Sequence, residues 1–357
     1  MLTPLVSILV PAFNAQEWIA DALRSAIAQT WKRREIIVID DGSTDQTFAI
    51  ARQFEDDGVL VVRQANRGAA AARNKAFSLC RGDYIQWLDA DDLLAADKIA
   101  KQMEVMKQCQ GRRTLLSGAW GQFFYRSSRA QFVPNGLWCN LSPTEWLLRK
   151  LEQNLFMQTA TWLVSRELTE NAGPWDTSLL SDDDGEYFCR VVLASVSVRF
   201  IADSKVFYRI SGSGSLGYIG RSARKCDAQW HSMKLQIGYL RSVDDSPRVR
   251  AACVTYLHNW IVFFNFYRPA LVSQVEEMVI ELGGKPGVPP SPGYPWMHAG
   301  FDRYIAKRVQ LALPGATATS MAFRSRRSLQ NFFDNVFFRI ENHRIGSRLR
   351  IGKRTEA

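Results

Sequence analysis

A run of acidic residues directly after a predicted strand is the feature with the clearest chemistry. Residues 84–88 form a short apolar and aromatic run, and Asp89, Asp91 and Asp92 follow at once. Such closely spaced carboxylates repel one another when partly removed from water, unless a cation lies among them. Their oxygens suit Mg²⁺ or Mn²⁺, which keep positions open for substrate phosphates. The alternative is a solvated acidic loop that caps a helix predicted over residues 93–108.

Polar and aromatic residues also follow three earlier predicted strands. Phe13 and Asn14 come after the first strand, an Asp pair at 40–41 after the second, and residues 66–73 after the third. In an open parallel sheet, ligands bind beyond the carboxyl ends of the strands. Singly, these residues could be turn formers or salt-bridge partners. Together they favour a nucleotide site with an aromatic ring for the base, a carboxylate for base or ribose, and a metal for a diphosphate.

The elements that would position these residues alternate between strand and helix. Strands are predicted over residues 6–11, 35–39, 59–63 and 84–88, with helical periodicity between them. We expect Asn14 to cap the first helix, and Ser43 with Gln46 to form a capping box for the second. This alternation predicts an α/β fold with a Rossmann-like, mostly parallel sheet and helices on both faces.

Beyond residue 108 the predicted elements are shorter. They are two strands within residues 115–126, a helix over 143–151 capped by Ser142, a strand over 161–165, and two closing strands within 198–210. A second acidic cluster, residues 181–186, opens a helical run, where the helix dipole favours ionised carboxylates. Residues 212–217 match a dinucleotide fingerprint in form only, because no strand with a terminal acid follows. We expect a loop there that closes over the diphosphate together with Arg209.

These motifs, taken together, resemble the family 2 glycosyltransferases. The resemblance covers about residues 5–210. It rests on residues 6–14, Asp-Asp-Gly-Ser-Thr-Asp at 40–45, Asn-Arg-Gly at 66–68 with Ala-Arg-Asn at 72–74, and Leu-Asp-Ala-Asp-Asp at 88–92. The resemblance implies the GT-A fold and sugar transfer with inversion from a nucleoside diphosphate, with UDP-sugars favoured.

The resemblance also implies a role for individual residues. The nucleotide-binding set is Pro11, Phe13, Asn14, Asp41, Asn66, Arg73 and Asp89, in which Phe13 stacks on the base and Asp41 contacts it. Asp89 and Asp91 form the Asp-x-Asp pair, with Asp91 as the ligand of Mn²⁺ or Mg²⁺. When the second cluster is aligned on Arg190, Asp183 and Asp184 take the places of the family's Glu-Asp pair, and Asp184 becomes the general base. A slip in register would substitute Asp182 or Glu186, and an acidic helix cap is the other interpretation.

The remainder of the chain predicts extensions to this domain. We expect the domain over residues 1–215, a helical extension over 216–282, a Pro/Gly-rich linker over 283–296 and a basic helical region over 297–357. From residue 324 onward, eight Arg and one Lys face three acids, and an apolar stripe runs from Phe332 to Ile340. This segment is either a peripheral contact with an anionic membrane or an ordinary docked helix. Family members often act on glycan or lipid-linked acceptors at the inner face of bacterial membranes, in polysaccharide biosynthesis of the cell envelope.

Composition narrows the remaining classes of function. Six scattered Cys residues without a Cys-x-x-Cys pair, and an N-terminus without a signal peptide, predict a cytoplasmic protein. The net charge of +10 is concentrated in the tail without a recognisable motif, so no nucleic acid is expected as a partner. Two alternatives remain open. One is a non-catalytic nucleotide-sugar-binding protein, and the other is a sugar nucleotidyltransferase, which would need a basic glycine-rich loop after the first strand.

Overall fold

The computed structural model describes residues 3–109, 111–210, 219 and 222–287 of the 357-residue chain. These described residues belong to one compact unit that ends at Gly287. The predicted glycine-rich loop at 212–217, most of the predicted linker and the predicted basic C-terminal region therefore lie outside the described residues.

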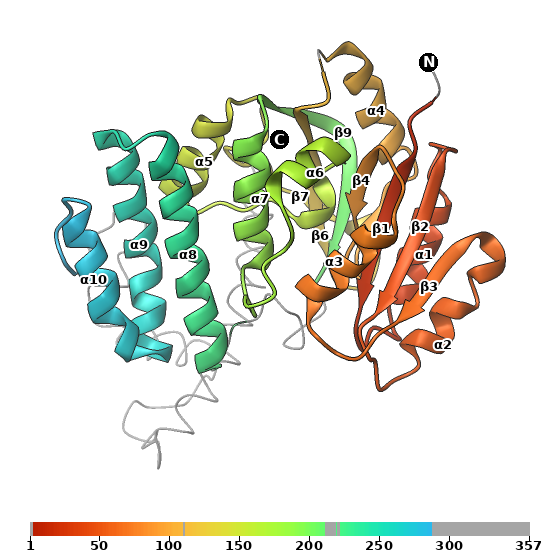
Figure 1. The fold of residues 1–357 in the computed structure, drawn as a ribbon, viewed down its shortest axis with the longest axis horizontal. Coiled ribbons are helices and arrows are strands. Elements are labelled where there is room, and N and C mark those ends of the chain that lie inside the picture. The colour runs from red at the N-terminus through yellow and green to blue at the C-terminus, as the bar shows by residue number, and fades with distance from the viewer. Residues whose placement is uncertain (1–2, 110, 211–218, 220–221, 288–357) are drawn as a thin grey trace, which may run out of the picture. The chain divides into compact units, whose positions relative to one another are not determined.

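A five-stranded sheet forms the N-terminal part of this unit (Figure 1). Its strand order is β3-β2-β1-β4-β8, in which only β8 runs antiparallel to its neighbour. The strands are β1 (Val6–Ala12), β2 (Arg34–Asp40), β3 (Val59–Arg63), β4 (Tyr84–Trp87) and β8 (Val164–Ser165). The central strand β1 is buried along its whole length, as its aliphatic sequence predicts. The strand predicted over 161–165 is shorter than expected, because a 3₁₀ turn, η3 (Thr159–Thr161), occupies its start.

The helices between the parallel strands are confirmed, but both predicted caps are wrong. The connecting helices are α1 (Ile19–Ile27), α2 (Thr47–Arg52), η1 (Glu55–Asp57) and α3 (Ala69–Leu79). Neither α1 nor α2 has a side-chain cap. Instead, the Asn14 carboxamide oxygen accepts a hydrogen bond from the Thr44 N–H at 2.9 Å, and Ser43 Oγ accepts one from the Asn14 N–H at 2.9 Å. The capping side chains thus join the loops after β1 and β2 to each other.

A second, four-stranded sheet of order β5-β9-β6-β7 extends the fold. Its strands are β5 (Leu93–Leu94), β6 (Thr114–Phe123), β7 (Gln131–Phe132) and β9 (Ser197–Arg209). The helix predicted from residue 93 therefore begins only at α4 (Lys98–Gln108). The two strand pairs predicted within 115–126 and 198–210 are each one continuous strand. The parallel β6–β9 ladder continues past a register shift between Gly118 and Ala119, where residues 202–204 of β9 have no partner in the β6 register.

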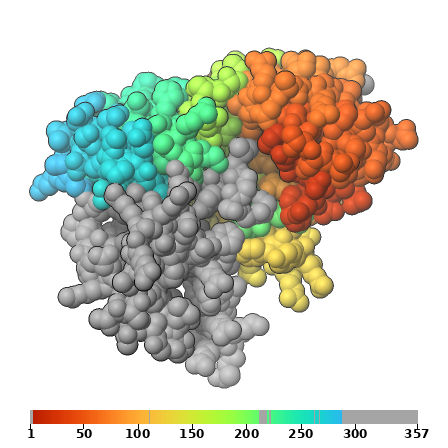
Figure 2. Space-filling view, turned by 90° about the horizontal axis from the view of Figure 1, so that it is seen from below, coloured from red at the N-terminus to blue at the C-terminus, as the bar shows by residue number. Residues whose placement is uncertain are grey.

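Most of the remaining helices lie where helical segments were predicted. The remaining helices are η2 (Ser127–Arg129), α5 (Pro143–Glu152), α6 (Arg166–Ala172), α7 (Asp183–Ala194), α8 (Ala223–Val243), α9 (Pro247–Tyr267), η4 (Pro269–Leu271) and α10 (Val272–Glu281). Of these, η2 and α6 were not predicted. Ser142 caps α5 as expected, since its Oγ accepts from the Glu145 N–H at 3.3 Å. Helix α8 packs against α7, and α9 and α10 lie beyond it at the end of the described unit opposite the N-terminal strands (Figures 1 and 2). No helix in the described part of the chain has the length and apolar character needed to cross a bilayer.

Candidate active site

The loops after β1, β2 and β3 meet around the Asp41 carboxylate. Asp41 is buried, and its oxygens accept hydrogen bonds from Gln64 Nε2 at 2.7 Å, the Arg67 N–H at 3.0 Å and the Gly68 N–H at 2.8 Å. Gly42 has a φ of 74°, and a Cβ there would lie 2.7 Å from the Asn66 nitrogen. The Asp-Gly pair therefore holds the loop that leads into α3. Its contact with a base stays a prediction.

The other predicted nucleotide-binding residues lie at the same sheet edge. Pro11 is buried within β1, whereas Phe13 has 49% of its surface exposed and Asn14 is also exposed. Asn66 is exposed in the loop that Asp41 holds. An exposed ring at the carboxyl end of a central strand is available for stacking, which is the role predicted for Phe13.

Arg73 joins the two acidic clusters. Its Nη2 lies 2.9 Å from Asp89 Oδ1, and its Nη1 lies 2.6 Å from Asp183 Oδ2. The guanidinium also lies over the Trp175 ring, 4.4 Å from the ring centroid. Burial by itself would lower the pKa of Arg73, but the charges of Asp183, Asp89 and Asp184 outweigh it and raise that pKa. We call Asp89–Arg73–Asp183 the Arg73 bridge, and it brings residues from β4 and α7 to one place.

Asp184 is the acid next to this bridge and lies in the first turn of α7. It is half-buried, and its Oδ2 accepts a hydrogen bond from Thr159 Oγ1 at 3.4 Å. Burial raises the pKa of Asp184 to about 7, and the negative charges of Asp183 and Asp182 add to the shift while Arg73 opposes it. A carboxylate that gains and loses its proton near neutral pH is suited to general base catalysis.

The neighbouring acids that a register slip would select are bound to other groups. Asp182 precedes α7 in the left-handed region, with a φ of 55°. Its Oδ2 accepts from Ser232 Oγ at 2.7 Å, Gln236 Nε2 at 2.6 Å and Gln229 Nε2 at 3.1 Å, all on α8. We call these three α8 residues the Asp182 cradle. A Cβ on Gly185 would collide with the Asp182 carboxylate, so glycine allows this close approach.

Glu186 and Arg190 form a separate structural pair on α7. Arg190 Nε lies 2.7 Å from Glu186 Oε1, and Tyr239 Oη donates to the same oxygen at 2.9 Å. Arg190 also donates to the carbonyl oxygens of Ala172 and, at 2.9 Å, Pro174. Arg190 therefore ties the end of α6 to α7. Its predicted part in the site is indirect in this geometry, because its described contacts are all with these neighbours and the Tyr187 ring.

The loop after β4 is fixed from the second sheet. The Arg209 N–H donates to Asp92 Oδ1 at 2.8 Å, and Arg209 Nε donates to the Asp91 carbonyl at 2.8 Å. The Arg209 guanidinium lies between the rings of Trp18 and Phe123, at 4.4 and 4.6 Å from their centroids. Arg209 is buried, so its side chain positions the acidic loop. Closure over a diphosphate, which we expected of Arg209, depends on residues outside the described part.

The Asp89 and Asp91 carboxylates suit a metal ion whose other ligands come from a diphosphate. Both side chains are partly exposed, whereas Asp92 is buried. Burial, and then the charges of Asp91 and Asp89, raise the pKa of Asp92 well above its usual value. Among the described residues, no group of three or more His, Cys, Asp or Glu could hold a metal by itself. Mg²⁺ and Mn²⁺ sites commonly use one or two carboxylates plus substrate phosphates, and Asp89 and Asp91 fit that pattern.

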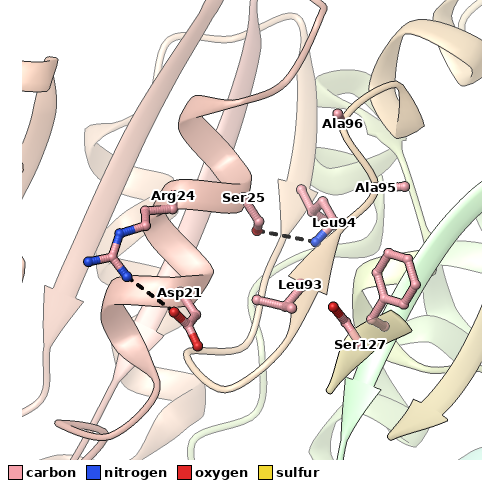
Figure 3. A pocket seen from close by; sticks show the side chains of 9 residues that line it. Asp21, Arg24, Ser25, Leu93, Leu94, Ala95, Ala96 and Ser127 are labelled. Atoms are coloured by element: carbon pink, nitrogen blue, oxygen red, sulfur yellow. Dashed lines mark hydrogen bonds and ion pairs between the residues drawn. The ribbon is translucent and has the colours of Figure 1, made fainter. Parts of the chain in front are cut away.

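The cavity shown in Figure 3 lies elsewhere. It has a volume of about 530 Å³ between α1 and the β5 region. Its lining includes an Asp21–Arg24 ion pair at 3.2 Å and Ser25, which accepts from the Leu94 N–H at 3.2 Å. None of the predicted nucleotide or catalytic residues lines it. One of its lining residues, Asp21, contacts the site residue Arg209, with Asp21 Oδ2 3.4 Å from Arg209 Nη2.

Three residues of the site were not predicted from the sequence. Gln158 donates to Asp92, Thr159 donates to Asp184, and Trp175 packs on Arg73. Gln158 and Trp175 lie in irregular segments and Thr159 begins the three-residue turn η3, and periodicity carries little information for such short segments. The predicted strand over 161–165 could have indicated that a strand end lies nearby, but the actual strand begins three residues later and the segment precedes it.

Comparison with known protein families supports the predicted resemblance. The sequence model described as "Glycosyl transferase family 2" matches residues 7–171, just under half of the chain. The match contains β1 to β4, the Asp-x-Asp pair and Arg73, so the predicted resemblance is confirmed. It ends before α7, so the assignment of Asp184 rests on geometry.

Several glycosyltransferases are similar in sequence to parts of this chain. A putative teichuronic acid biosynthesis glycosyltransferase, TuaG of Bacillus subtilis, is 43% identical over 108 residues, covering 29% of this chain and 43% of that protein. WfaP of Escherichia coli, named as a UDP-Glc:α-D-GlcNAc-diphosphoundecaprenol β-1,3-glucosyltransferase, is 39% identical over 29% of this chain and 41% of that protein. An uncharacterized glycosyltransferase of Rickettsia typhi is 25% identical over 73% of this chain and 80% of that protein. The chain thus spans less than half of the first two relatives.

The fold of the described residues is similar to that of a solved structure. The Staphylococcus aureus TarS structure with UDP-GlcNAc superposes with a TM-score of 0.59 at 18% identity, covering 78% of this chain and 79% of that one. The GT-A fold with C-terminal helices is therefore confirmed. At this identity the likeness concerns the fold alone.

Proposed function

We propose that this chain is an inverting glycosyltransferase that moves a sugar from a nucleoside diphosphate, with UDP favoured, to a hydroxyl of a glycan or lipid-linked acceptor. The observation that carries the proposal is the Arg73 bridge. It holds Asp89 of the Asp-x-Asp pair and Asp183 in the first turn of α7 against one guanidinium, with half-buried Asp184 next to Asp183. A donor diphosphate and a general base are needed at one place for this reaction, and the bridge supports that arrangement.

Inversion requires attack from the face opposite the departing diphosphate. As the acceptor oxygen bonds to the anomeric carbon, Asp184 takes the hydroxyl proton, and the bond to the diphosphate breaks with its electron pair. The pKa of about 7 leaves a large share of Asp184 ionised at neutral pH. Phe13 would stack on the base, while Asp41 and Asn66 shape its pocket.

Asp89 and Asp91 would hold a divalent cation, Mn²⁺ or Mg²⁺. When bound, such an ion neutralises charge on the leaving diphosphate. Arg73 supplies a fixed positive charge near the same position and is held there by Asp89, Asp183 and the Trp175 ring. Asp92 turns its carboxylate toward Gln158 and Arg209 and so fixes the loop.

The printed function of a relative supports the substrate class. WfaP is named for transfer from UDP-glucose to a lipid diphosphate acceptor, and it is similar to this chain over 104 residues. The basic tail beyond residue 324 supports peripheral contact with the inner face of a membrane, where such acceptors lie. Cytoplasmic localisation is part of the same proposal.

A donor panel tests the proposal directly. The full chain is incubated with UDP-, GDP- and dTDP-sugars, an N-acetylglucosaminyl diphospholipid and Mn²⁺, and release of the nucleoside diphosphate is measured. We expect release with one donor, dependence on the acceptor, and loss on chelation with EDTA or in Asp91→Asn. The glycosidic product should have the anomeric configuration opposite to that of the donor. Donor binding without turnover on any acceptor tested would favour a non-catalytic nucleotide-sugar-binding protein instead.

A further inference from the structure

Three aromatic side chains meet on the second sheet. Trp120 of β6 packs against Phe156, with ring centroids 4.9 Å apart and an interplanar angle of 41°. It also packs against Tyr208 of β9, at 5.9 Å and 86°. Trp120 is 8% exposed, whereas Phe156 is 49% exposed. We call these three residues the aromatic platform, because an exposed ring rests on a buried indole whose orientation is fixed by packing.

The segment of residues 156–159 connects the platform to both acidic clusters. Two residues after Phe156, Gln158 Nε2 donates to the buried Asp92 carboxylate. One residue later, Thr159 Oγ1 donates to Asp184 Oδ2 at 3.4 Å. The exposed ring therefore lies on the same short segment as the hydrogen-bond partner of the general base.

Tyr208, the platform residue on β9, is also close in the chain to a residue that contacts the first acidic cluster. Tyr208 directly precedes Arg209, whose N–H donates to Asp92 Oδ1 at 2.8 Å. Burial, and then the negative charges of Asp92, Asp91, Asp89 and Asp184, raise the pKa of Tyr208. The platform is thus next to the acids on two independent elements, η3 with its preceding loop and β9.

We propose that the aromatic platform is the acceptor subsite, on which a pyranose ring lays its apolar C–H face against Phe156 while a hydroxyl at its edge reaches Asp184. This inference rests on the proposed function. A general base must lie within hydrogen-bond reach of the proton it removes, so the acceptor ring must bind close to Asp184. A sugar ring is apolar on its faces and polar at its edge, and an aromatic surface bordered by carboxylates is complementary to both.

The placement of the nucleotide residues separates this subsite from the donor site. Phe13, Asp41 and Arg73 come from the first sheet and its connecting helix α3, at the ends of β1, β2 and β3. Trp120 and Tyr208 come from the second sheet. In an inverting transfer the acceptor approaches from the side opposite the diphosphate, and the two sheets supply two different surfaces for the two substrates.

Kinetics of Phe156→Ala test the assignment. With the full chain, Mn²⁺, the donor that the panel identifies and an N-acetylglucosaminyl diphospholipid, we expect the acceptor KM to rise about tenfold, the scale of one lost aromatic contact. The donor KM and the slow hydrolysis of donor without acceptor should stay unchanged. Phe156→Tyr should restore the acceptor KM. Leu60→Ala is the matched control, because Leu60 is 48% exposed on β3 and remote from the platform in the sheet order.

The outcomes separate this inference from the proposed function. A wild-type chain that transfers sugar while Phe156→Ala keeps its acceptor KM would overturn the subsite and leave the transferase intact. A rise in the donor KM alone would overturn it as well, since the ring would then serve the donor. A wild-type chain without turnover would remove the proposed function and the subsite together. In Trp120→Phe a smaller ring supports Phe156, so the acceptor KM should rise less than it does in Phe156→Ala. The melting temperature of this variant should stay within about 3 °C of the wild-type value.

Discussion

The two acidic clusters of the site are held in different ways. The loop after β4 is fixed by its own turn, in which the Asp92 N–H donates to the Asp89 carbonyl at 3.1 Å, and by Arg209 at the end of β9. The start of α7 is fixed by the Asp182 cradle, whose Ser232 lies 50 residues further along the chain. The first cluster thus depends on the two sheets, whereas the second depends on the helical extension.

This difference shows that the helical extension contributes to the geometry of the site. Asp182 has a left-handed backbone conformation that non-glycine residues seldom adopt, and the three cradle donors on α8 offset its cost. Gln236 in turn accepts a hydrogen bond from buried Lys150 of α5. Helices α5, α7 and α8 together therefore set the position of Asp183, which contacts Arg73, and of Asp184, which contacts Thr159.

Removing the carboxylate of the second cluster should have the largest effect. In Asp184→Asn we expect kcat to fall about 10² to 10⁴-fold, the usual contribution of a positioned general base. Donor affinity, measured by calorimetry, should stay within about twofold because the predicted nucleotide residues are untouched. Normal turnover in this variant would show that the base is another group.

The stability of the same variant distinguishes catalysis from folding. The pKa of Asp184 is raised to about 7 in the folded state, so the protonated side chain stabilises the fold below pH 4. This contribution to the free energy of unfolding is lost as the pH rises through 7. Asparagine has no such ionisation. At pH 8, Asp184→Asn should therefore melt at the wild-type temperature or above it, and a lower melting temperature would point to a structural role.

Breaking the link between the clusters should cost stability as well as activity. Arg73→Gln leaves the Asp89 and Asp183 carboxylates without their shared cation, and loss of one partner from a buried pair costs about 3 kcal/mol. We expect a lower melting temperature and weaker donor binding. Arg52→Gln is the control, since its ion pair with Glu55 is exposed and such pairs contribute about 1 kcal/mol or less. Equal losses in the two variants would contradict a special role for the Arg73 bridge.

The pH dependence of transfer should report the second cluster alone. Because the pKa of Asp184 is raised to about 7, the base is protonated at lower pH, and kcat/KM should fall about tenfold per unit below pH 6 and level off above pH 8. Donor affinity measured over the same range should not follow this curve. A profile that is flat from pH 5 to 8 would contradict the assignment of Asp184.

The contrast between the clusters also explains how far the sequence could predict the site. The strand ends, the Asp-x-Asp pair and Arg73 depend on local periodicity and on the rule that parallel strands end at one edge, so they could be predicted. The choice among Asp184, Asp182 and Glu186 depends on α8, whose side chains bind Asp182 and Glu186, and no local pattern encodes those contacts. The predicted caps failed for a similar reason, because Asn14 and Ser43 bond across loops that only the folded sheet brings together.

The second sheet was missed because its pairings are long-range. Strand β5 has only two residues, and it forms a strand because Leu93 and Leu94 pair with Phe207 and Val206. The aromatic platform depends on the same sheet, since Trp120 and Tyr208 meet through the β6–β9 ladder. Sequence periodicity cannot place residues that are about 90 positions apart in contact.

Loosening the cradle should give the smallest effect and the sharpest test of the comparison. Ser232→Ala removes one of the three donors to Asp182 Oδ2 and should cost about 1 kcal/mol of stability. If the cradle positions the base, kcat should fall by about fivefold and the midpoint of the pH profile should move, because the charge of Asp182 contributes to the raised pKa of Asp184. Ser242→Ala on the same helix is the control, since Ser242 is exposed and bonds only the Tyr239 carbonyl at 2.7 Å among its described contacts. A pH midpoint that stays in place while stability falls would mean that α8 supports the fold without setting the base, and the two clusters would then differ in packing alone.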